Sequence, residues 1–392
     1  MERWLRSLMS YSARGLTNDE WSLVDRFHQD IGALLASAPR DDDGVLHDVS
    51  AIKSKLAGLG FGAVDVPQAL GGLGASSTAQ AAIQFIAGYH DLDLRDAAHV
   101  GHGRLILEYG QADVVDRWAP RLVSGELVGI ALTEEVGGTN VRAIGAQGHR
   151  CSDGSWTVTG RKVYVSRIVE SAAFVVFMRR ADDDSLAAVI VEANASGLHR
   201  VLLRQDGLRG WSWGNLILDH VRLGPENVLV PSLGDGRDLA NRHFDYYRPM
   251  VSMTALGGAA AAFDTTLRIL QDRIAQRRIQ RPLDSSLEKI GTCFIQLQSA
   301  ILASVAALHS VERGHSDASV WARTTKAYGV DIAYRSVEQL QLLTGANSYE
   351  RGDPLNKVLH DLRGFMYADG IHDALLQSAG HQLLHSMPTP HP

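Results

Sequence analysis

Toward its C-terminal end the chain reads Asp361-Leu362-Arg363-Gly364-Phe365-Met366-Tyr367-Ala368-Asp369-Gly370-Ile371-His372-Asp373. The carboxylate of Asp369 comes directly before a glycine, at the point where two helical runs meet. Glycine permits a backbone bend that a residue with a Cβ resists, and a carboxylate on such a bend can project into a cavity and act as a general base. Asp-Gly is also a common solvent-facing turn, so the rest of the sequence must decide between the two.

The composition is that of a globular protein with a sizeable core. The chain has 392 residues, of which 45% are hydrophobic and 21% charged, and this length suggests two or three domains. The formal net charge is -6 and no long block of like charge occurs, so a nucleic-acid partner is not expected. Two cysteines, Cys151 and Cys293, are too few for a disulfide scaffold or a cysteine-ligated zinc site and are typical of a reducing cytosol.

We expect a cytoplasmic protein without a membrane or metal site. The first fifteen residues lack a sustained apolar core, and no run of about 18 apolar residues occurs. Among the sixteen histidines no HExxH or comparable metal spacing appears. His99 and His102 are three residues apart and could share a helix face, but packing or hydrogen bonding is the favoured interpretation over a metal site.

Hydrophobic periodicity divides the chain into three parts. Residues 1–129 read as helices at 17–36, 45–59, 77–89, 99–109 and 112–123, the first opened by a capping box from Thr17 to Glu20. Residues 130–240 read as short alternating strands at 155–159, 162–166, 172–178, 186–192, 198–203 and 216–223, which predict a small antiparallel barrel or sandwich. Residues 241–392 read as a four-helix bundle with helices at 246–278, 285–313, 318–343 and 354–384. The predicted fold class is therefore α+β.

Four more motifs lie at the joints between these parts. They are Ile130-Ala131-Leu132-Thr133-Glu134-Glu135-Val136-Gly137-Gly138-Thr139-Asn140, Gly160-Arg161-Lys162-Val163-Tyr164-Val165-Ser166-Arg167, Phe244-Asp245-Tyr246-Tyr247-Arg248-Pro249 and Gln341-Leu342-Leu343-Thr344-Gly345-Ala346-Asn347. The first motif has two interpretations. It is either a loop that presents backbone N–H groups and hydroxyls to a planar ring or a phosphate, or a glycine-rich linker. The second motif also has two interpretations. It is either a strand whose aromatic ring and hydroxyl lie on one side and contact a flat cofactor, or an edge strand with one mixed face.

Taken in this order and at these spacings, the motifs resemble those of the acyl-CoA dehydrogenase family over nearly the whole chain. The segment from Thr133 to Asn140 is similar to the family's TEPxxGSD, and Lys162 to Ser166 is similar to its K-x-W-I-T strand. Further matches are Pro67 with Gly71-Gly72-Leu73-Gly74, Tyr109-Gly110, Ser124-Gly125-Glu126, Gly207-Leu208-Arg209-Gly210-Trp211-Ser212 and Asp219-His220-Val221-Arg222-Leu223.

The resemblance implies FAD bound between the β-domain and the bundle, and a homodimer or homotetramer in which a second subunit completes that site. The FAD-binding residues carried over by position are Leu132, Thr133, Gly138, Thr139, Tyr164, Ser166, Ile371 and Asp373, together with Arg273, Gln341, Thr344 and Gly345 from the neighbouring subunit. Arg277 is an alternative to Arg273, because the sequence departs from the family's R-x-x-F-G just beyond it.

The resemblance also implies a reaction, in which a base removes the α-proton of an acyl thioester and the flavin accepts a hydride from Cβ. Asp369 falls on the position of the family's catalytic glutamate, and Arg248, Tyr367 and Gly370 are the expected substrate-binding residues. The thioester is carried on CoA or on an acyl carrier protein, and a flavoprotein is a possible electron acceptor.

The sequence departs from the family pattern at several positions, which predicts a biosynthetic role in secondary metabolism rather than fatty-acid oxidation. The base is Asp, one methylene shorter than Glu, and Glu135, Val136, Tyr164, Thr344 and His360 replace usual family residues. Two alternatives remain open: a flavin-dependent monooxygenase of the same fold, and a catalytically silent member of the family.

Overall fold

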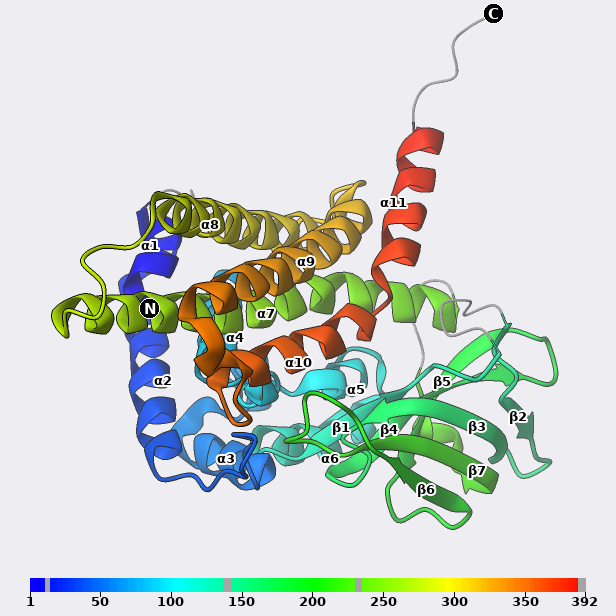
Figure 1. Ribbon diagram of the computed structural model, residues 1–392. Coiled ribbons are helices and arrows are strands. Elements are labelled where there is room, and N and C mark those ends of the chain that lie inside the picture. Colours follow the sequence, from blue (N-terminus) through cyan, green and yellow to red (C-terminus); the bar gives the residue numbers. More distant parts are fainter. Residues whose placement is uncertain (11–14, 137–142, 230–234, 387–392) are drawn as a thin grey trace, which may run out of the picture.

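The computed structural model describes residues 1–10, 15–136, 143–229 and 235–386. Along these ranges helices come first, a β-sheet follows, and a second set of helices completes the chain (Figure 1). The predicted α+β class is therefore confirmed.

The N-terminal part is built from helices and short helical turns. They are α1 (Glu2–Ser10), α2 (Asn18–Ala36), α3 (Val49–Leu56), the π-helical η1 (Ala57–Phe61), η2 (Gln68–Leu70), α4 (Ser77–His90), η3 (Leu92–Leu94), η4 (Gly101–Gly103), α5 (Arg104–Tyr109) and α6 (Ala112–Val123). The predicted capping box at the start of α2 is confirmed, because the Thr17 hydroxyl accepts from the backbone N–H of Glu20 while the Glu20 carboxylate accepts from that of Thr17.

The central part is one eight-stranded sheet. Its strands are β1 (Leu127–Ala131), β2 (Gln147–Arg150), β3 (Trp156–Ser166), β4 (Ser171–Arg180), β5 (Leu186–Glu192), β6 (Leu198–Leu203), β7 (Trp213–Leu223) and β8 (Val228–Leu229), with η6 (Pro225–Asn227) before the last. The strand order is β6-β7-β3-β2-β4-β5-β8, and β1 pairs with β4.

This sheet differs from the antiparallel barrel or sandwich that the sequence predicts. β1 and β2 both run parallel to β4, while the other pairs are antiparallel, and the sheet is mixed and not closed. An alternating pattern reports which face of a strand is buried, whereas the direction of its neighbour depends on the path of the intervening chain.

β4 is buried on both faces. Phe174 and Val176 pack with β3, β5 and β7, whereas Val175 and Phe177 pack against α5 and α6. This double burial explains the continuous apolar run in its sequence. It also fixes the sheet against the N-terminal helices, with β1 alongside.

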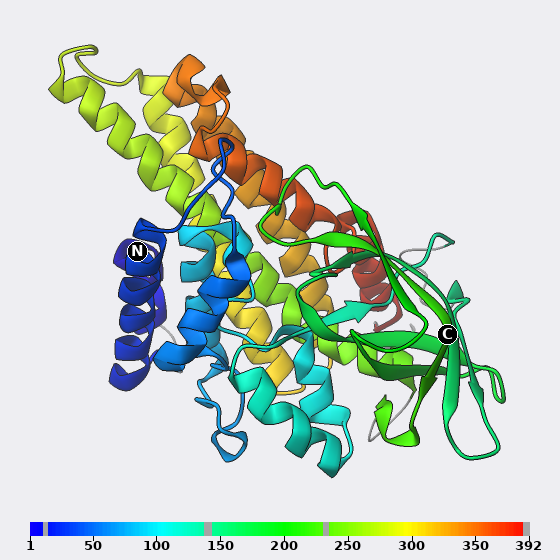
Figure 2. The ribbon, with the colours of Figure 1, turned by 90° about the horizontal axis from the view of Figure 1, so that it is seen from below.

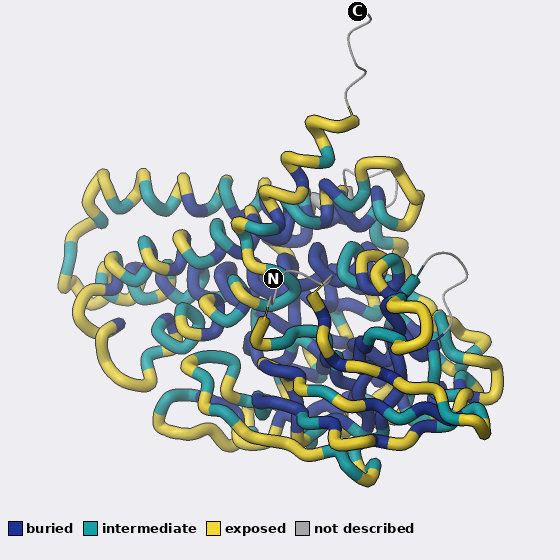
Figure 3. Tube along the Cα trace, turned by 90° about the vertical axis from the view of Figure 1, so that its right-hand side faces the viewer, coloured by how far each residue is buried: buried dark blue, intermediate teal, exposed yellow. Residues whose placement is uncertain are grey.

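The C-terminal part is a helical bundle. Its elements are α7 (Gly236–Ala275), α8 (Asp284–Glu312), α9 (Ala318–Thr344), η7 (Gly345–Tyr349), α10 (Pro354–Tyr367) and α11 (His372–Ser386). The predicted helix 354–384 is thus two helices, and α11 projects from the body with much of its trace exposed (Figure 3). α7 starts at Gly236, capped by Asp235, so it crosses the predicted domain boundary at residue 240.

α8 is long enough and apolar enough to cross a membrane, which the sequence does not lead us to expect. Its buried residues Cys293, Leu297 and Ile301 belong to the core that α7 and α9 share. The core helix of a helical bundle meets the same criterion of length and composition.

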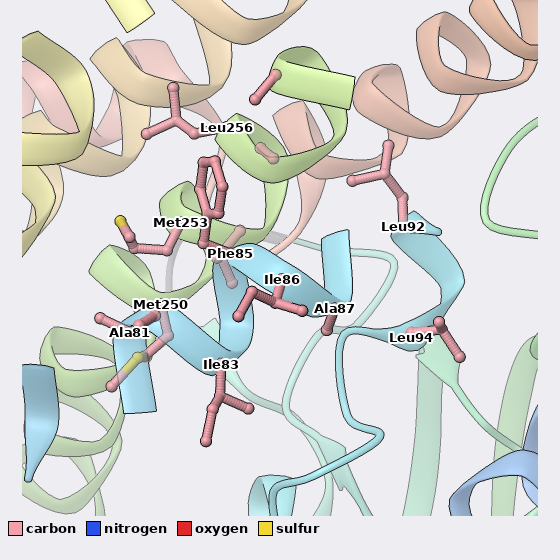
Figure 4. Packing of buried hydrophobic residues seen from close by; sticks show 14 of the residues in the cluster. Ala81, Ile83, Phe85, Ile86, Ala87, Leu92, Leu94, Met250, Met253 and Leu256 are labelled. Atoms are coloured by element: carbon pink, nitrogen blue, oxygen red, sulfur yellow. The ribbon is translucent and has the colours of Figure 1, made fainter. Parts of the chain in front are cut away.

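α4 and α7 join the N-terminal part to the bundle, and their backbones are in close contact (Figure 4). A Cβ on Gly257 would lie 2.0 Å from the carbonyl oxygen of Phe85, and a Cβ on Gly88 would lie 2.0 Å from that of Thr254. Glycine is therefore required at both crossing points. The helices leave no room for a ligand between their backbones at these points.

Candidate functional site

The predicted bend at Asp369-Gly370 is confirmed. α10 ends at Tyr367 and α11 begins at His372, with backbone φ of 54° at Asp369 and 107° at Gly370. Residues with a Cβ seldom adopt such angles, although Asp and Asn do so more readily than most. A Cβ on Gly370 would also lie 2.8 Å from the Leu375 side chain. Packing and backbone conformation both require glycine after the aspartate.

Two buried cations hold this bend through its carbonyl groups. Arg248 Nε donates to the carbonyl oxygen of Asp369 at 3.1 Å, and Lys326 Nζ donates to those of Gly370 at 2.8 Å and Met366 at 3.4 Å. Lys326 therefore caps the C-terminal end of α10, where carbonyl groups lack helical partners. Burial lowers the pKa of Lys326 to about 7, although the negative charge of Asp369 opposes that shift.

The Asp369 side chain is buried beside a third cation. Its exposed fraction is 7%, and Oδ2 lies 3.4 Å from a guanidinium nitrogen of Arg95, in the segment between η3 and η4. This oxygen has no hydrogen-bond partner among the described residues. Burial alone would lower the pKa of Arg95, but the carboxylates of Asp369 and Asp96 outweigh it and raise that pKa. Arg95 therefore stays cationic.

An ionic chain extends from this point to the end of β3. Arg167, at a φ of 56°, pairs with Asp96, and Lys53 Nζ donates to the carbonyl oxygens of Asp96 and His99 at 2.7 Å each. Burial lowers the pKa of Arg167, while Asp96 and Asp369 act in the opposite direction. Arg167 follows Ser166, so this chain brings the predicted flavin-facing strand close to the bend.

Leu132 and Thr133 lie beside β3, the strand that carries Tyr164 and Ser166, and we call these four residues the sheet-side group. Val163 N–H donates to the Thr133 carbonyl at 2.9 Å, and Lys162 Nζ donates to that of Leu132 at 3.2 Å. The hydroxyls of Thr133 and Ser166 have no hydrogen bond to any described residue.

Tyr164 gives this group an exposed aromatic ring. Its backbone φ is 61°, its exposed fraction is 59%, and it stacks on Trp213 with ring centroids 5.2 Å apart and planes at 19°. Free hydroxyls beside an exposed ring suit a flat ligand that stacks and accepts hydrogen bonds. The sheet-side group therefore fits the isoalloxazine that the resemblance implies.

Arg273, Gln341, Thr344 and Gly345, which we call the distal group, lie elsewhere. Arg273 donates to the carbonyl of Thr344, and Gln341 Nε2 donates to that of Ser348 at 2.9 Å. These residues lie at the C-terminal ends of α7 and α9, remote from the sheet (Figures 1 and 2). One chain therefore does not bring the distal and sheet-side groups together. Arg277 is exposed beyond the end of α7.

The remaining predicted residues lie around the bend or outside the described ranges. Tyr367 is 70% exposed at the end of α10, Ile371 is 42% exposed, and Asp373 is exposed in the first turn of α11. Gly138 and Thr139 lie outside the described residues.

A second cluster of buried charges lies at the other end of α10. Lys357 Nζ lies 2.7 Å from Asp91, 3.1 Å from Asp93 and 2.7 Å from Asp361. These carboxylates lie close enough together to hold a metal ion, but the lysine ammonium occupies the position that a cation would take.

His99 and His102 are not paired with each other. His99 faces Asp65 at 3.6 Å, and His102 contacts His243 at 2.9 Å.

A polar cavity of about 510 Å³ opens beside α7, one turn before Arg248. Its lining includes Arg104, Arg242, Asp245 and Tyr246. Asp245 also pairs with Arg248 at 2.8 Å, which in turn contacts the bend. The cavity is therefore linked to Asp369 through two side chains.

Sequence reasoning missed Arg95, Lys326 and Trp213, and it assigned no role to Arg167. One signal was present: Asp93, Arg95, Asp96 and His99 interrupt an otherwise apolar stretch from Leu92 to Val100. Charged residues in a segment that must be buried predict an internal ion pair or a functional site.

Comparison with known proteins supports the interpretation of these features. Three domain models of acyl-CoA dehydrogenase match in chain order: the N-terminal domain over residues 26–126, the middle domain over 129–221 and the C-terminal domain over 234–384. The very long-chain specific acyl-CoA dehydrogenase of Rattus norvegicus mitochondria is 26% identical over 338 residues, 81% of this chain and 50% of that protein. The chain thus spans about half the length of this relative.

Solved structures share the fold. Butyryl-CoA dehydrogenase from Megasphaera elsdenii has a TM-score of 0.85 at 20% identity, over 94% of this chain and 99% of that one. A glutaryl-CoA dehydrogenase from Mycobacterium smegmatis in complex with FADH2 has a TM-score of 0.82 at 18% identity, over 98% and 100%. The three domain models and the shared architecture together establish that the chain belongs to the acyl-CoA dehydrogenase family.

Proposed function

We propose that this protein oxidises an acyl thioester in an FAD-dependent reaction, with Asp369 as the base. The observation that carries this proposal is the Asp369 carboxylate itself. It is 7% exposed, lies on a bend held by Arg248 and Lys326, and keeps Oδ2 free of hydrogen bonds to described residues. This oxygen lies 3.4 Å from the Arg95 guanidinium but accepts no hydrogen bond from a described residue, so it remains able to receive a proton.

The residues that would hold FAD are the sheet-side group of one chain and the distal group of another. The chemistry that FAD supplies when bound is acceptance of the hydride from Cβ of the acyl group. Within the chain, Oδ2 of Asp369 takes the proton from Cα. Burial of the Asp369 side chain keeps water away from its carboxylate, and the backbone contacts from Arg248 and Lys326 hold the bend in position while the proton moves.

A second copy of the chain is part of this proposal. The distal group lies remote from the sheet-side group in one chain, so a neighbour has to supply it. α8 exposes Leu287, Ile295 and Leu302, and α9 exposes Trp321, Tyr328 and Leu342. Spacings of seven, eight or fourteen residues place each set on one side of its helix, which gives an apolar surface suited to a second copy.

The proposal includes the carrier of the thioester, which is CoA or an acyl carrier protein. It also includes a role of the protein in a biosynthetic pathway. The charged side chains in the lining of the cavity beside Asp245 suit the polar arm of such a carrier. A flavoprotein is the proposed electron acceptor.

Anaerobic titration of the purified holoprotein with acyl-CoAs and acyl-carrier proteins tests the function. We expect a substrate to bleach the flavin absorbance near 450 nm in the absence of any added reductant. Oxygen uptake that depends on NADH, without bleaching by any thioester, would support the monooxygenase instead. A colourless protein that does not take up FAD would contradict both enzymatic functions.

A further inference from the structure

Three pairs of histidine rings are in contact among the described residues. They are His28 with His90, His102 with His243, and His381 with His385. In the first two pairs the rings are hydrogen-bonded to each other through their nitrogens, at 2.8 Å and 2.9 Å. In the third pair both residues are exposed, and neither ring forms a hydrogen bond with a described residue. The ring nitrogens of this pair therefore remain available to a ligand.

His381 and His385 lie four residues apart on α11, in the stretch His381-Gln382-Leu383-Leu384-His385. Side chains at this spacing lie on one face of a helix, as do the two zinc-binding histidines of an HExxH helix. The sequence-based expectation that no comparable spacing occurs therefore does not hold for this pair.

The distance between the two rings suits a shared metal ion. Their centroids are 4.2 Å apart. Two imidazole nitrogens bound to one tetrahedral ion lie about 3.3 Å apart, so rotation of the two side chains suffices to bring both rings onto one ion. The helix backbone does not have to move.

The end of α11 also favours a cation electrostatically. The last carbonyl groups of a helix lack helical partners and give that end a partial negative charge. In the Lys357 cluster an ammonium already occupies the position of a metal ion, whereas no described cation forms an ion pair or a hydrogen bond with His381 or His385.

Tertiary packing supports the first part of α11 but not its last turn. Leu375 is buried, and Gln382 accepts a hydrogen bond from Arg323 of α9 at 3.2 Å. The described residues after Gln382 are all exposed, where α11 projects from the body (Figure 3). An ion shared by His381 and His385 would fasten this exposed turn to the turn before it.

We propose that His381 and His385 form a binding site for a divalent transition-metal ion, Cu²⁺ or Zn²⁺, and that the bound ion stabilises the last two turns of α11. Both ions bind well to imidazole, and water completes the coordination. Cu²⁺ binds more tightly than Zn²⁺ at such a site, whereas Mg²⁺ requires oxygen ligands. The site goes beyond the proposed oxidation and does not depend on it.

The experiment titrates the chelator-treated holoprotein with ZnCl₂, CuCl₂ and MgCl₂ in separate calorimetric runs. We expect one Zn²⁺ or Cu²⁺ ion to bind per chain at this site, and no binding of Mg²⁺ that depends on either histidine. His381→Ala or His385→Ala should weaken binding by about 100-fold or more, because the two imidazoles bind one ion as a chelate. His199→Ala, at an exposed histidine of β6, is the matched control and should bind as the wild type does.

A double variant tests the spacing itself. Leu383→His combined with His385→Leu keeps the number of histidines but places them two residues apart, where they do not face each other. Both positions are exposed, so the variant should fold normally and bind the ion as weakly as His385→Ala does. Binding that persists in this variant or in both alanine variants overturns the site. A wild type that binds neither Zn²⁺ nor Cu²⁺ overturns it as well.

Amide hydrogen exchange tests the effect of the ion on the helix. At a free Zn²⁺ concentration of about 100 times Kd, exchange in residues 381–386 should slow by up to about 100-fold, because the ion binds the helical form of this segment. The double variant should show no slowing at the same concentration. Unchanged exchange in the wild type overturns the stabilising role. Neither measurement uses a thioester, so failure of this site leaves the proposed oxidation as it stands.

Discussion

The buried charges at the two ends of α10 are partnered in different ways. At the N-terminal end, Lys357 is surrounded by Asp91, Asp93 and Asp361, and Arg40 adds a second cation at 2.6 Å from Asp91. At the C-terminal end, Asp369 has one guanidinium at 3.4 Å and an oxygen with no hydrogen bond to a described residue.

Fully paired buried charges are typical of a structural cluster, whereas buried charges with unpaired atoms are typical of a ligand-binding or catalytic site. The Lys357 cluster, meaning Lys357 with its three aspartates, fastens α10 to the N-terminal helices, and Asp361 also accepts from the backbone N–H of Leu208. Breaking such a cluster leaves uncompensated charge in the interior. Around Asp369 the protein instead retains unused donors and an unused acceptor, which a ligand can satisfy. Variants of the two ends should therefore change different properties.

Asp369→Asn is expected to have the largest effect. The amide cannot take the α-proton, so the rate of substrate-dependent flavin bleaching should fall by up to about 10⁴-fold. FAD binding should change little, because the bend is held through its carbonyls, whereas the unfolding temperature should fall, because the buried Arg95 loses its carboxylate partner. Stopped-flow reduction near 450 nm and thermal unfolding measure the two properties. Unchanged bleaching would show that Asp369 is not the base.

Lys357→Met comes next, and it should act on stability. Removing the cation leaves the three carboxylates facing one another, which is expected to lower the free energy of unfolding by about 3–5 kcal/mol. The loss should be smaller at pH 5 than at pH 8, because protonation of the carboxyls relieves the repulsion. Urea unfolding at both pH values tests this. A loss that is the same at both would argue against charge as the cause.

Asp369→Glu should have an intermediate effect, lowering the reduction rate by about 100-fold. The longer side chain moves its oxygens by roughly 1 Å toward Arg95, and misplacement on this scale costs that much. Glutamate also tolerates the positive φ at this position less well than aspartate. Rapid-reaction kinetics with the best substrate provide the test. A variant as fast as the wild type would show that the site is not adapted to the shorter acid.

Asp93→Asn is expected to have the smallest effect and to appear in the pH dependence of stability. Burial, with the charges of Asp361 and Asp91, raises the pKa of Asp93 to about 7 in the folded protein, against an ordinary value of 3.8. The folded state therefore binds the extra proton between about pH 4 and pH 7, and stability from this group is lost as pH rises through that window.

An amide at position 93 carries no charge at any of these pH values. The variant should be more stable than the wild type at pH 8 by on the order of 1 kcal/mol and nearly equal to it at pH 5. Urea unfolding at the two pH values again measures the difference. Parallel pH profiles for variant and wild type would contradict the assignment.

Features encoded by neighbouring residues were predictable from the sequence. The capping box at Thr17 and the bend at Asp369-Gly370 depend on local backbone chemistry, and both are present. The start of α7 was not predictable, since residues 236–243 are largely polar. They are helical because Leu239, Ala240 and His243 are buried against other elements.

The environment of Asp369 was the least predictable part of the candidate site. Arg95, Arg248 and Lys326 come from three separate elements and meet only in the folded chain. Sequence spacing does not report contacts of this kind. The parallel pairing of β1 with β4 escaped prediction for the same reason.

The contacts that hold the Asp369 bend have a consequence for how such proteins diversify. Arg248 and Lys326 bind carbonyl oxygens, which every amino acid has, so the scaffold does not depend on which side chain position 369 carries. The positive φ narrows the choice chiefly to residues that adopt it readily, such as Asp, Asn and Gly. Substitution there can remove or alter the acid–base chemistry while the architecture persists, so descendants with new or no activity can arise by a single codon change without first losing the fold.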